Sequence, residues 1–103
     1  MSAPDTCLNL IMPSALADDV VDLLLGHREL AISFASFPVN AHGADVALVE
    51  PSEHVSGQAS RIQIQLLLRR EDAETVLGYL KAQLPNPKVF YWATPILLEG
   101  RLG

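Results

Sequence analysis

The stretch that decides the fold is RIQIQLLLR, residues 61–69. Every second residue from position 62 is apolar: Ile62, Ile64, Leu66 and Leu68. Alternation with this period is typical of a strand that buries one face and leaves mostly polar side chains on the other. A shift of one residue would turn the apolar side chains away from the core, so we expect a well-defined pairing register for this strand.

Downstream of this stretch the sequence predicts a helix and a further strand. Apolar residues recur at helical spacing from about Glu71 to Leu84, acidic residues stand near the start, and Pro85-Asn86-Pro87 ends the helix. The last predicted strand covers residues 89–93, with Phe90 and Trp92 on one side and apolar or aromatic neighbours on the other. Both faces of this strand therefore need cover.

Upstream, residues 6–12 are apolar or small except for Asn9 and predict a short buried strand closed by Pro13. Ser14 is a preferred N-cap residue, and apolar residues follow it at helical spacing. We therefore predict a helix that Ser14 caps and Gly26 stops.

A second strand is indicated by the alternation of Leu30, Ile32 and Phe34. Phe37 and Val39 fall out of this phase, so we expect a bulge near residues 35–36 and the end of the strand at Pro38.

The segment from Asn40 to Ser60 is the main candidate for function. It has no sustained period, and it carries Asp45, Glu50 and Glu53 without any lysine or arginine. Loops of about 20 structureless residues are uncommon in compact domains unless they are functional or disordered. We expect this loop to be mobile in the free protein and to become ordered when a divalent metal or a target protein binds.

The predicted order is strand, helix, strand, strand, helix, strand, which is the split β-α-β pattern of a ferredoxin-like sandwich. The predicted fold class is α+β, a ferredoxin-like βαββαβ sandwich with an antiparallel sheet, in a single domain of residues 1–103. Both helices cover one side of such a sheet. Apolar residues on the other side, such as Leu67, are therefore expected to be buried between subunits.

The composition argues against several classes of partner. With 7 basic and 12 acidic residues, the net charge is −5, so the chain offers no basic surface for nucleic acid or for an anionic membrane. Its one cysteine, Cys7, excludes an intramolecular disulfide and fits a reducing compartment. The first apolar run ends at Pro13, so neither a signal peptide nor membrane insertion is predicted. By elimination we expect a soluble cytoplasmic protein.

Three short motifs stand out: Ala41-His42-Gly43, then Glu53-His54-Val55-Ser56-Gly57, and finally Tyr91-Trp92-Ala93-Thr94-Pro95 with Gly100-Arg101-Leu102. The first resembles a Gly-His-Gly element and the second resembles Glu-Gln-Val-x-Gly, while the third is the most specific. Together with the order and spacing of the predicted elements, they give the sequence a resemblance to the PII-like proteins, in particular to the DUF3240 group.

The resemblance implies a ferredoxin-like homotrimer whose long loop, the T-loop of PII proteins, reaches out to target proteins. Members of this group are often encoded beside heavy-metal efflux pumps. The implied role is a signalling or regulatory one linked to metal resistance, with a membrane efflux transporter as a candidate target. His54 replaces the usual glutamine and Gln58 the usual basic residue, so the family's roles for these two positions are not carried over.

Conventional PII proteins bind ATP through a glycine-rich loop with a lysine between the second helix and the last strand, where backbone N–H groups surround the phosphates. Here the corresponding residues 84–88 are few, include no glycine and include two prolines, which lack an N–H group. We therefore expect ATP and ADP to bind weakly or not at all. Lys88 is interpreted as a solvated lysine at a strand end.

Imidazole and carboxylate groups in the long loop form a candidate site for a divalent transition metal. The candidate ligands are His42, His54, Asp45, Glu50 and Glu53. Their spacing matches no standard metal motif, so the alternative is a pair of solvated histidines in an acidic loop. A trimer would bring three copies of one histidine together. No other cofactor is indicated.

The remaining reactive side chains are given structural roles. We expect Cys7 to be a buried, inert thiol and His27 to cap carbonyls at the end of the first helix. Tyr91 and Trp92 are expected in the core or an interface. Solvated arginines are predicted at positions 61, 69 and 70.

Three functions remain open at this stage. The first is a trimeric PII-like sensor or adaptor that acts through its long loop. The second is a nucleotide-binding PII-type signalling protein, and the third is a small enzyme on the same fold. For an enzyme, no pair of nucleophile and base or of two acids can be placed, so no catalytic residue is assigned and the first function is preferred.

Overall fold

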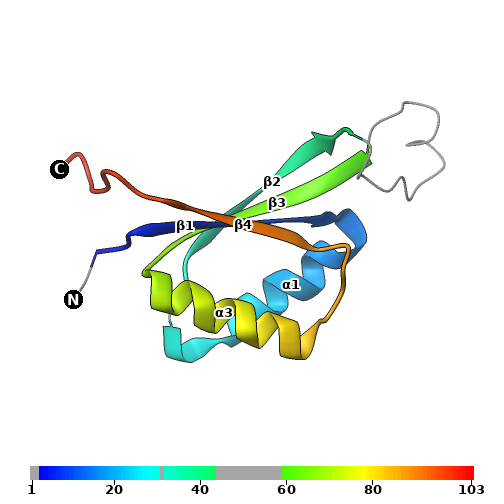
Figure 1. The fold of residues 1–103 in the computed structure, drawn as a ribbon, viewed down its shortest axis with the longest axis horizontal. Helices are drawn as coiled ribbons and strands as arrows, with labels where there is room; N and C mark the ends of the chain where they lie inside the picture. The colour runs from blue at the N-terminus through cyan, green and yellow to red at the C-terminus, as the bar shows by residue number, and fades with distance from the viewer. Residues whose placement is uncertain (1–2, 31, 44–58) are drawn as a thin grey trace.

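The computed structural model describes residues 3–30, 32–43 and 59–103. The elements are β1 (Thr6–Pro13), α1 (Ser14–Gly26), a 3-10 turn η1 (Arg28–Leu30), β2 (Phe34–Ala41), β3 (Ala59–Leu68), α3 (Arg70–Gln83) and β4 (Phe90–Pro95). The strands form one sheet in the order β2-β3-β1-β4, and every neighbouring pair is antiparallel. Figure 1 shows both helices on the same side of this sheet. The predicted α+β ferredoxin-like sandwich is confirmed.

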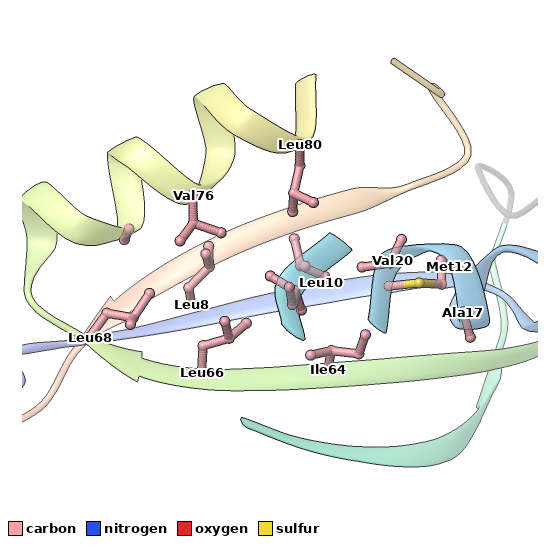
Figure 2. Packing of buried hydrophobic residues seen from close by; sticks show 12 residues of the cluster. Leu8, Leu10, Met12, Ala17, Val20, Ile64, Leu66, Leu68, Val76 and Leu80 are labelled. Carbon is pink, nitrogen blue, oxygen red and sulfur yellow. The ribbon is translucent and has the colours of Figure 1, made fainter. Parts of the chain in front are cut away.

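The core lies between the sheet and the two helices. It contains Leu8, Leu10 and Met12 of β1, Ile64, Leu66 and Leu68 of β3, Ala17, Val20 and Leu24 of α1, and Ala73, Val76 and Leu80 of α3. Figure 2 shows Val76 and Leu80 pointing from α3 towards the sheet. The alternation predicted for residues 62–68 is observed, because Ile64 and Leu66 are fully buried while Leu67 is 53% exposed.

The second strand differs from its prediction. It begins at Phe34 rather than Leu30, which ends the 3-10 turn, and it runs past Pro38 to Ala41. The pairing with β3 is continuous from Phe34 opposite Leu66 to Ala41 opposite Ala59, so there is no bulge. Pro38 is tolerated because β2 is an edge strand, where a missing N–H group costs no ladder bond on the outer side.

The start of α1 is also different. Ser14 is the first helical residue, Pro13 is the N-cap, and no side chain caps the helix. Pro13 still pairs with Arg61 in the sheet, so the strand passes directly into the helix without a separate capping residue. The φ of −57° at Pro13 suits this change of direction. In the described part of the chain, no helix is long and apolar enough to cross a membrane.

Candidate interaction surface

His42 is the one predicted metal ligand that the structure describes. Its side chain is exposed and lies just after the end of β2, where Ala41 pairs with Ala59. Gly43 follows with a φ of +124°, a conformation that residues with a side chain rarely adopt, so the backbone leaves the strand at this point. The other predicted ligands, Asp45, Glu50, Glu53 and His54, lie outside the described residues.

Across residues 3–30, 32–43 and 59–103, no group of three His, Cys, Asp or Glu side chains could hold a metal ion. The ends of the long loop nevertheless lie side by side, because the last pair of the β2–β3 ladder joins Ala41 to Ala59. The chain therefore leaves and re-enters the sheet at the end of this hairpin.

The sheet face opposite the helices, here called the open face, is the main candidate interaction surface among the described residues. The pairing register places on it Cys7, Asn9 and Ile11 of β1, Ala35, Phe37 and Val39 of β2, Arg61, Gln63, Gln65 and Leu67 of β3, and Phe90, Trp92 and Thr94 of β4. Among these side chains Arg61 alone carries a charge, and it is only 7% exposed. Leu67 and Phe90 are 53% and 62% exposed, so the open face is a surface with exposed apolar side chains and no exposed charge.

Asn9 lies at the centre of the open face and is only 4% exposed. Its Oδ1 accepts hydrogen bonds from Gln63 Nε2 at 3.0 Å and from Gln65 Nε2 at 3.4 Å. Its Nδ2 donates to Cys7 Sγ at 3.6 Å. A polar group with this little exposure is costly unless it is paired, so the three amides form a fixed polar strip across an otherwise apolar surface.

Aromatic side chains flank this strip. Trp92 lies opposite Asn9 in the β1–β4 ladder and is half-buried, with its ring centroid 5.9 Å from that of Phe90. Tyr91 points to the helix side, where its hydroxyl accepts a hydrogen bond from Lys81 Nζ at 3.1 Å. The prediction that the last strand carries aromatic side chains on both faces is confirmed.

Two of the predictions for single residues were wrong. Arg61 is 7% exposed rather than solvated, and its Nη1 donates to the Ser60 carbonyl oxygen at 3.1 Å. His27 donates through its backbone N–H to the Leu24 carbonyl oxygen, but its ring caps no carbonyl. That ring instead packs edge-on against Tyr79 with 4.7 Å between the centroids, and its Nδ1 is buried without a hydrogen bond. Contact with an aromatic ring on α3 holds the imidazole away from the end of α1.

Of the remaining predictions for single residues, the one for Arg70 is confirmed, whereas Arg69 and Cys7 differ from expectation. Arg70 is exposed and Arg69 is half-buried, and both form ion pairs with neighbouring carboxylates. Cys7 is a free thiol that is only partly buried, because it lies on the open face rather than in the core.

The connection between α3 and β4 is well ordered by its own hydrogen bonds. The N–H of Leu84 donates to the Leu80 carbonyl oxygen, and the N–H groups of Lys88 and Val89 donate to the side-chain and backbone oxygens of Asn86. Pro85 and Pro87 have no N–H group. In this fully described stretch, only the N–H of Asn86 is left for a ligand.

Solved structures define the class of fold to which this arrangement belongs. CPII, a nitrogen regulatory PII-like protein from Thiomonas intermedia, was solved with ADP, AMP and bicarbonate and is similar with a TM-score of 0.67, 14% identity, and coverage of 96% of this chain and 97% of that one. The periplasmic divalent cation tolerance protein CutA from Archaeoglobus fulgidus is similar with a TM-score of 0.67 and 18% identity. The match covers 93% of this chain and 87% of that one. The fold is that of the PII-like and CutA proteins.

The family model described as a protein of unknown function, DUF3240, matches residues 2–103, so the chain belongs to the DUF3240 family. A crystal structure of a DUF3240 family protein from Shewanella baltica is similar with a TM-score of 0.74 and 20% identity over the whole of both chains. No curated protein matches the sequence.

Proposed function

We propose that this chain is a PII-like regulatory or adaptor protein, a cytoplasmic homotrimer that binds a target protein through the loop of residues 40–60 and catalyses no reaction. The observation that carries the proposal is the open face, a sheet surface with exposed Leu67 and Phe90, no exposed charge and a fixed amide strip at its centre. A small domain gains stability by covering such a surface with further copies of itself.

The charge of the chain supports a second copy as the cover. Because each chain carries a net charge of −5, copies repel one another wherever charged surfaces meet. The open face carries no acidic side chain, and its one charged residue, Arg61, is buried, so contact there avoids the repulsion at close range. The central amides also keep N–H and carbonyl groups that a second copy could satisfy.

The position of the loop supports a role in binding. Figure 1 shows the end of the β2–β3 hairpin at one extreme of the molecule and both chain termini at the other. Contact through the open face would leave the hairpin ends outside the assembly, where the loops remain accessible to a target. A heavy-metal efflux transporter is the target that we propose, and a divalent transition metal bound by loop histidines is the proposed signal.

Sedimentation equilibrium tests the assembly directly. We expect a species of three times the 11.2 kDa chain mass. The Leu67→Glu variant should dissociate, because it puts charge on the open face. The Leu25→Glu variant is the matched control, since Leu25 is 63% exposed on α1, and it should stay trimeric. A wild-type monomer at micromolar concentration would contradict the proposed assembly.

Retention on membrane vesicles tests the proposed target. The wild-type protein should bind vesicles that contain a heavy-metal efflux transporter and not vesicles without it. A variant in which a Gly-Ser linker replaces residues 44–58 should remain trimeric and lose this retention. Equal retention of the two proteins would remove the loop from the proposed function.

A further inference from the structure

The chain ends in a tail, residues 96–103, that leaves the body of the molecule. The N–H of Ile96 donates to the Asp5 carbonyl oxygen at 3.0 Å. Beyond this bond, Leu97, Leu98 and Leu102 are 91%, 93% and 111% exposed. Burial of leucine side chains is favourable, so an ordered binding site for the tail would be stabilised by several such contacts.

An apolar hollow lies between the C-terminal half of α3 and the start of β4. Its walls include Leu77, Leu80, Leu84 and Val89, and its rim includes Lys81 and Tyr91. The volume is about 150 Å³. Sites for cofactors and drug-sized ligands occupy about 300–1,000 Å³, whereas an apolar cavity of about 150 Å³ engineered into another protein holds one benzene molecule. The hollow therefore fits one leucine-sized side chain.

The tail of the same chain is directed away from this hollow. Val89 and Tyr91 line the hollow at the start of β4, while the tail follows the end of β4 at Pro95. Figure 1 shows the tail leaving the sheet at the end opposite to the connection between α3 and β4. A second copy of the chain is the natural source of a leucine for this site.

The charges on the rim indicate which leucine fits. Lys81 Nζ is exposed at the rim and bonds to the Tyr91 hydroxyl, and among the described residues Lys81 forms no ion pair. In the tail, Glu99 directly follows Leu98. With Leu98 in the hollow, the Glu99 carboxylate comes close to the Lys81 ammonium group, and opposite charges at such a rim favour one partner and one orientation.

We propose that the tail of one copy docks on a neighbouring copy, with Leu98 in the α3–β4 hollow and Glu99 beside Lys81. The inference rests on the self-association proposed above and adds a second contact to it, away from the open face. The tail then links subunits, and the hollow is a protein-binding site rather than a ligand pocket.

Disulfide trapping between two co-expressed full-length chains tests the proposal. Both chains carry Cys7→Ser, one carries Leu98→Cys and the other, marked by an affinity tag, carries Leu84→Cys. Mild oxidation should give a mixed disulfide-linked dimer. Replacing Leu84→Cys by Leu25→Cys, an exposed position on α1, should abolish it. Equal yield with Leu25→Cys would overturn the proposal, because it would indicate random collision.

A charge exchange at exposed positions provides a second measurement that does not disturb the core. Lys81→Glu or Glu99→Lys alone should lower the yield of the mixed disulfide several-fold, and the two together should restore it. Loss without restoration would contradict the pairing. If the wild-type chain proves monomeric, the self-association fails and the tail docking fails with it. If the chain is trimeric and no mixed disulfide forms, the tail proposal alone is wrong.

Discussion

Asn9 accepts two hydrogen bonds within the subunit and also lies at the centre of the open face, and substitutions can separate these two roles. Asn9→Ala removes the acceptor of the Gln63 and Gln65 amides at a position that is 4% exposed. Gln63 is half-buried and Gln65 is exposed, so their donors can turn to water, and a typical hydrogen bond contributes about 0.5–1.5 kcal/mol. We expect a loss of this size in the free energy of unfolding, measured by urea denaturation.

Asn9→Asp is the matched variant, because a carboxylate still accepts from both glutamines. Its fold should persist, but the charge at the centre of the open face should weaken self-association in sedimentation experiments. An Asn9→Asp protein that remains fully associated would show that the open face is not the contact surface.

Asp5 joins three segments at the other end of β1. Its Oδ1 accepts hydrogen bonds from the Thr6 hydroxyl and the backbone N–H of Arg70, both at 2.9 Å. Its backbone bonds to Leu68 and Ile96. The first N–H of α3 has no partner within the helix, so the Asp5 carboxylate, which lies directly before β1, caps α3 from a distant part of the chain.

The pKa of Asp5 predicts how the stability depends on pH. The Thr6 hydroxyl is the main cause that lowers this pKa below the usual 3.8, with help from the Arg70 N–H and the Arg69 charge and against a smaller effect of burial. A lowered folded-state pKa contributes stability above the ordinary pKa, and this stability is lost as the pH falls below it.

In thermal unfolding, Asp5→Asn should therefore lower the midpoint at neutral pH, and the difference from wild type should shrink once the pH falls below about 3.8. A difference that stays constant across this range would mean that the charge of Asp5 has no part in the effect.

The histidines of the long loop give a prediction about metal binding. Titration of zinc, copper or cobalt into the wild type should show binding that weakens in acid, because protons compete with the metal for imidazole. The His42→Ala, His54→Ala double variant should lose metal binding. The His27→Ala variant is the control and should keep it, because His27 lies against Tyr79 rather than in the long loop. Equal affinity of the wild type and the double variant would remove both histidines from the site.

At the scale of elements, α1 shows how sharply one helix separates its faces. Leu24 is 1% exposed and its neighbour Leu25 is 63% exposed. Leu24→Ala should lower the free energy of unfolding by about 2–5 kcal/mol because it leaves a cavity. Leu25→Ala should change it by no more than about 0.5 kcal/mol. Urea denaturation of both variants measures the difference, and similar losses would contradict the observed orientation of α1.

Periodicity predicted the elements that bury only one face. The strand at residues 61–69 and the two helices each present a single apolar side to the core, and all three are observed. The second strand was harder to predict because its apolar residues lie on both faces of the sheet. Phe34 packs against the core, while Phe37 and Val39 lie on the open face. What resembled a bulge in the sequence is a change of face in a regular strand.

Two long-range contacts could not be predicted from the sequence. The bonds from Asn9 to Gln63 and from Asp5 to Arg70 join residues more than fifty positions apart and depend on the exact register of β1 with β3. Asn9 gave a local signal, as a lone polar residue in an apolar strand, but its partners could be identified only once the pairing was known.

At the scale of the whole molecule, the main feature is that its two ends differ in what they carry. The described chain measures 49 × 31 × 22 Å, with the hairpin end and the termini at opposite extremes (Figure 1). A contact through the open face and a contact through the tail therefore involve different parts of the molecule. This separation would let the loops respond to a target without disturbing the subunit contacts.

Because the fold is similar to PII-like folds, nucleotide binding has to be considered. The α3–β4 connection predicts that nucleotides do not bind. Phosphate binding by backbone requires several free N–H groups pointing to one place. From Leu84 to Val89, two residues are prolines and three N–H groups are already bonded, so only the N–H of Asn86 is left.

We therefore predict that ATP and ADP, with magnesium present, give no binding heat in calorimetry and no shift of the unfolding midpoint. The shift is a sensitive measure, because a ligand at 100 times its Kd stabilises the folded state by about 2.7 kcal/mol. Inorganic phosphate serves as the control for weak anion effects at the exposed Lys88. Micromolar affinity for either nucleotide would contradict the prediction and favour a nucleotide-binding signalling protein of the PII type.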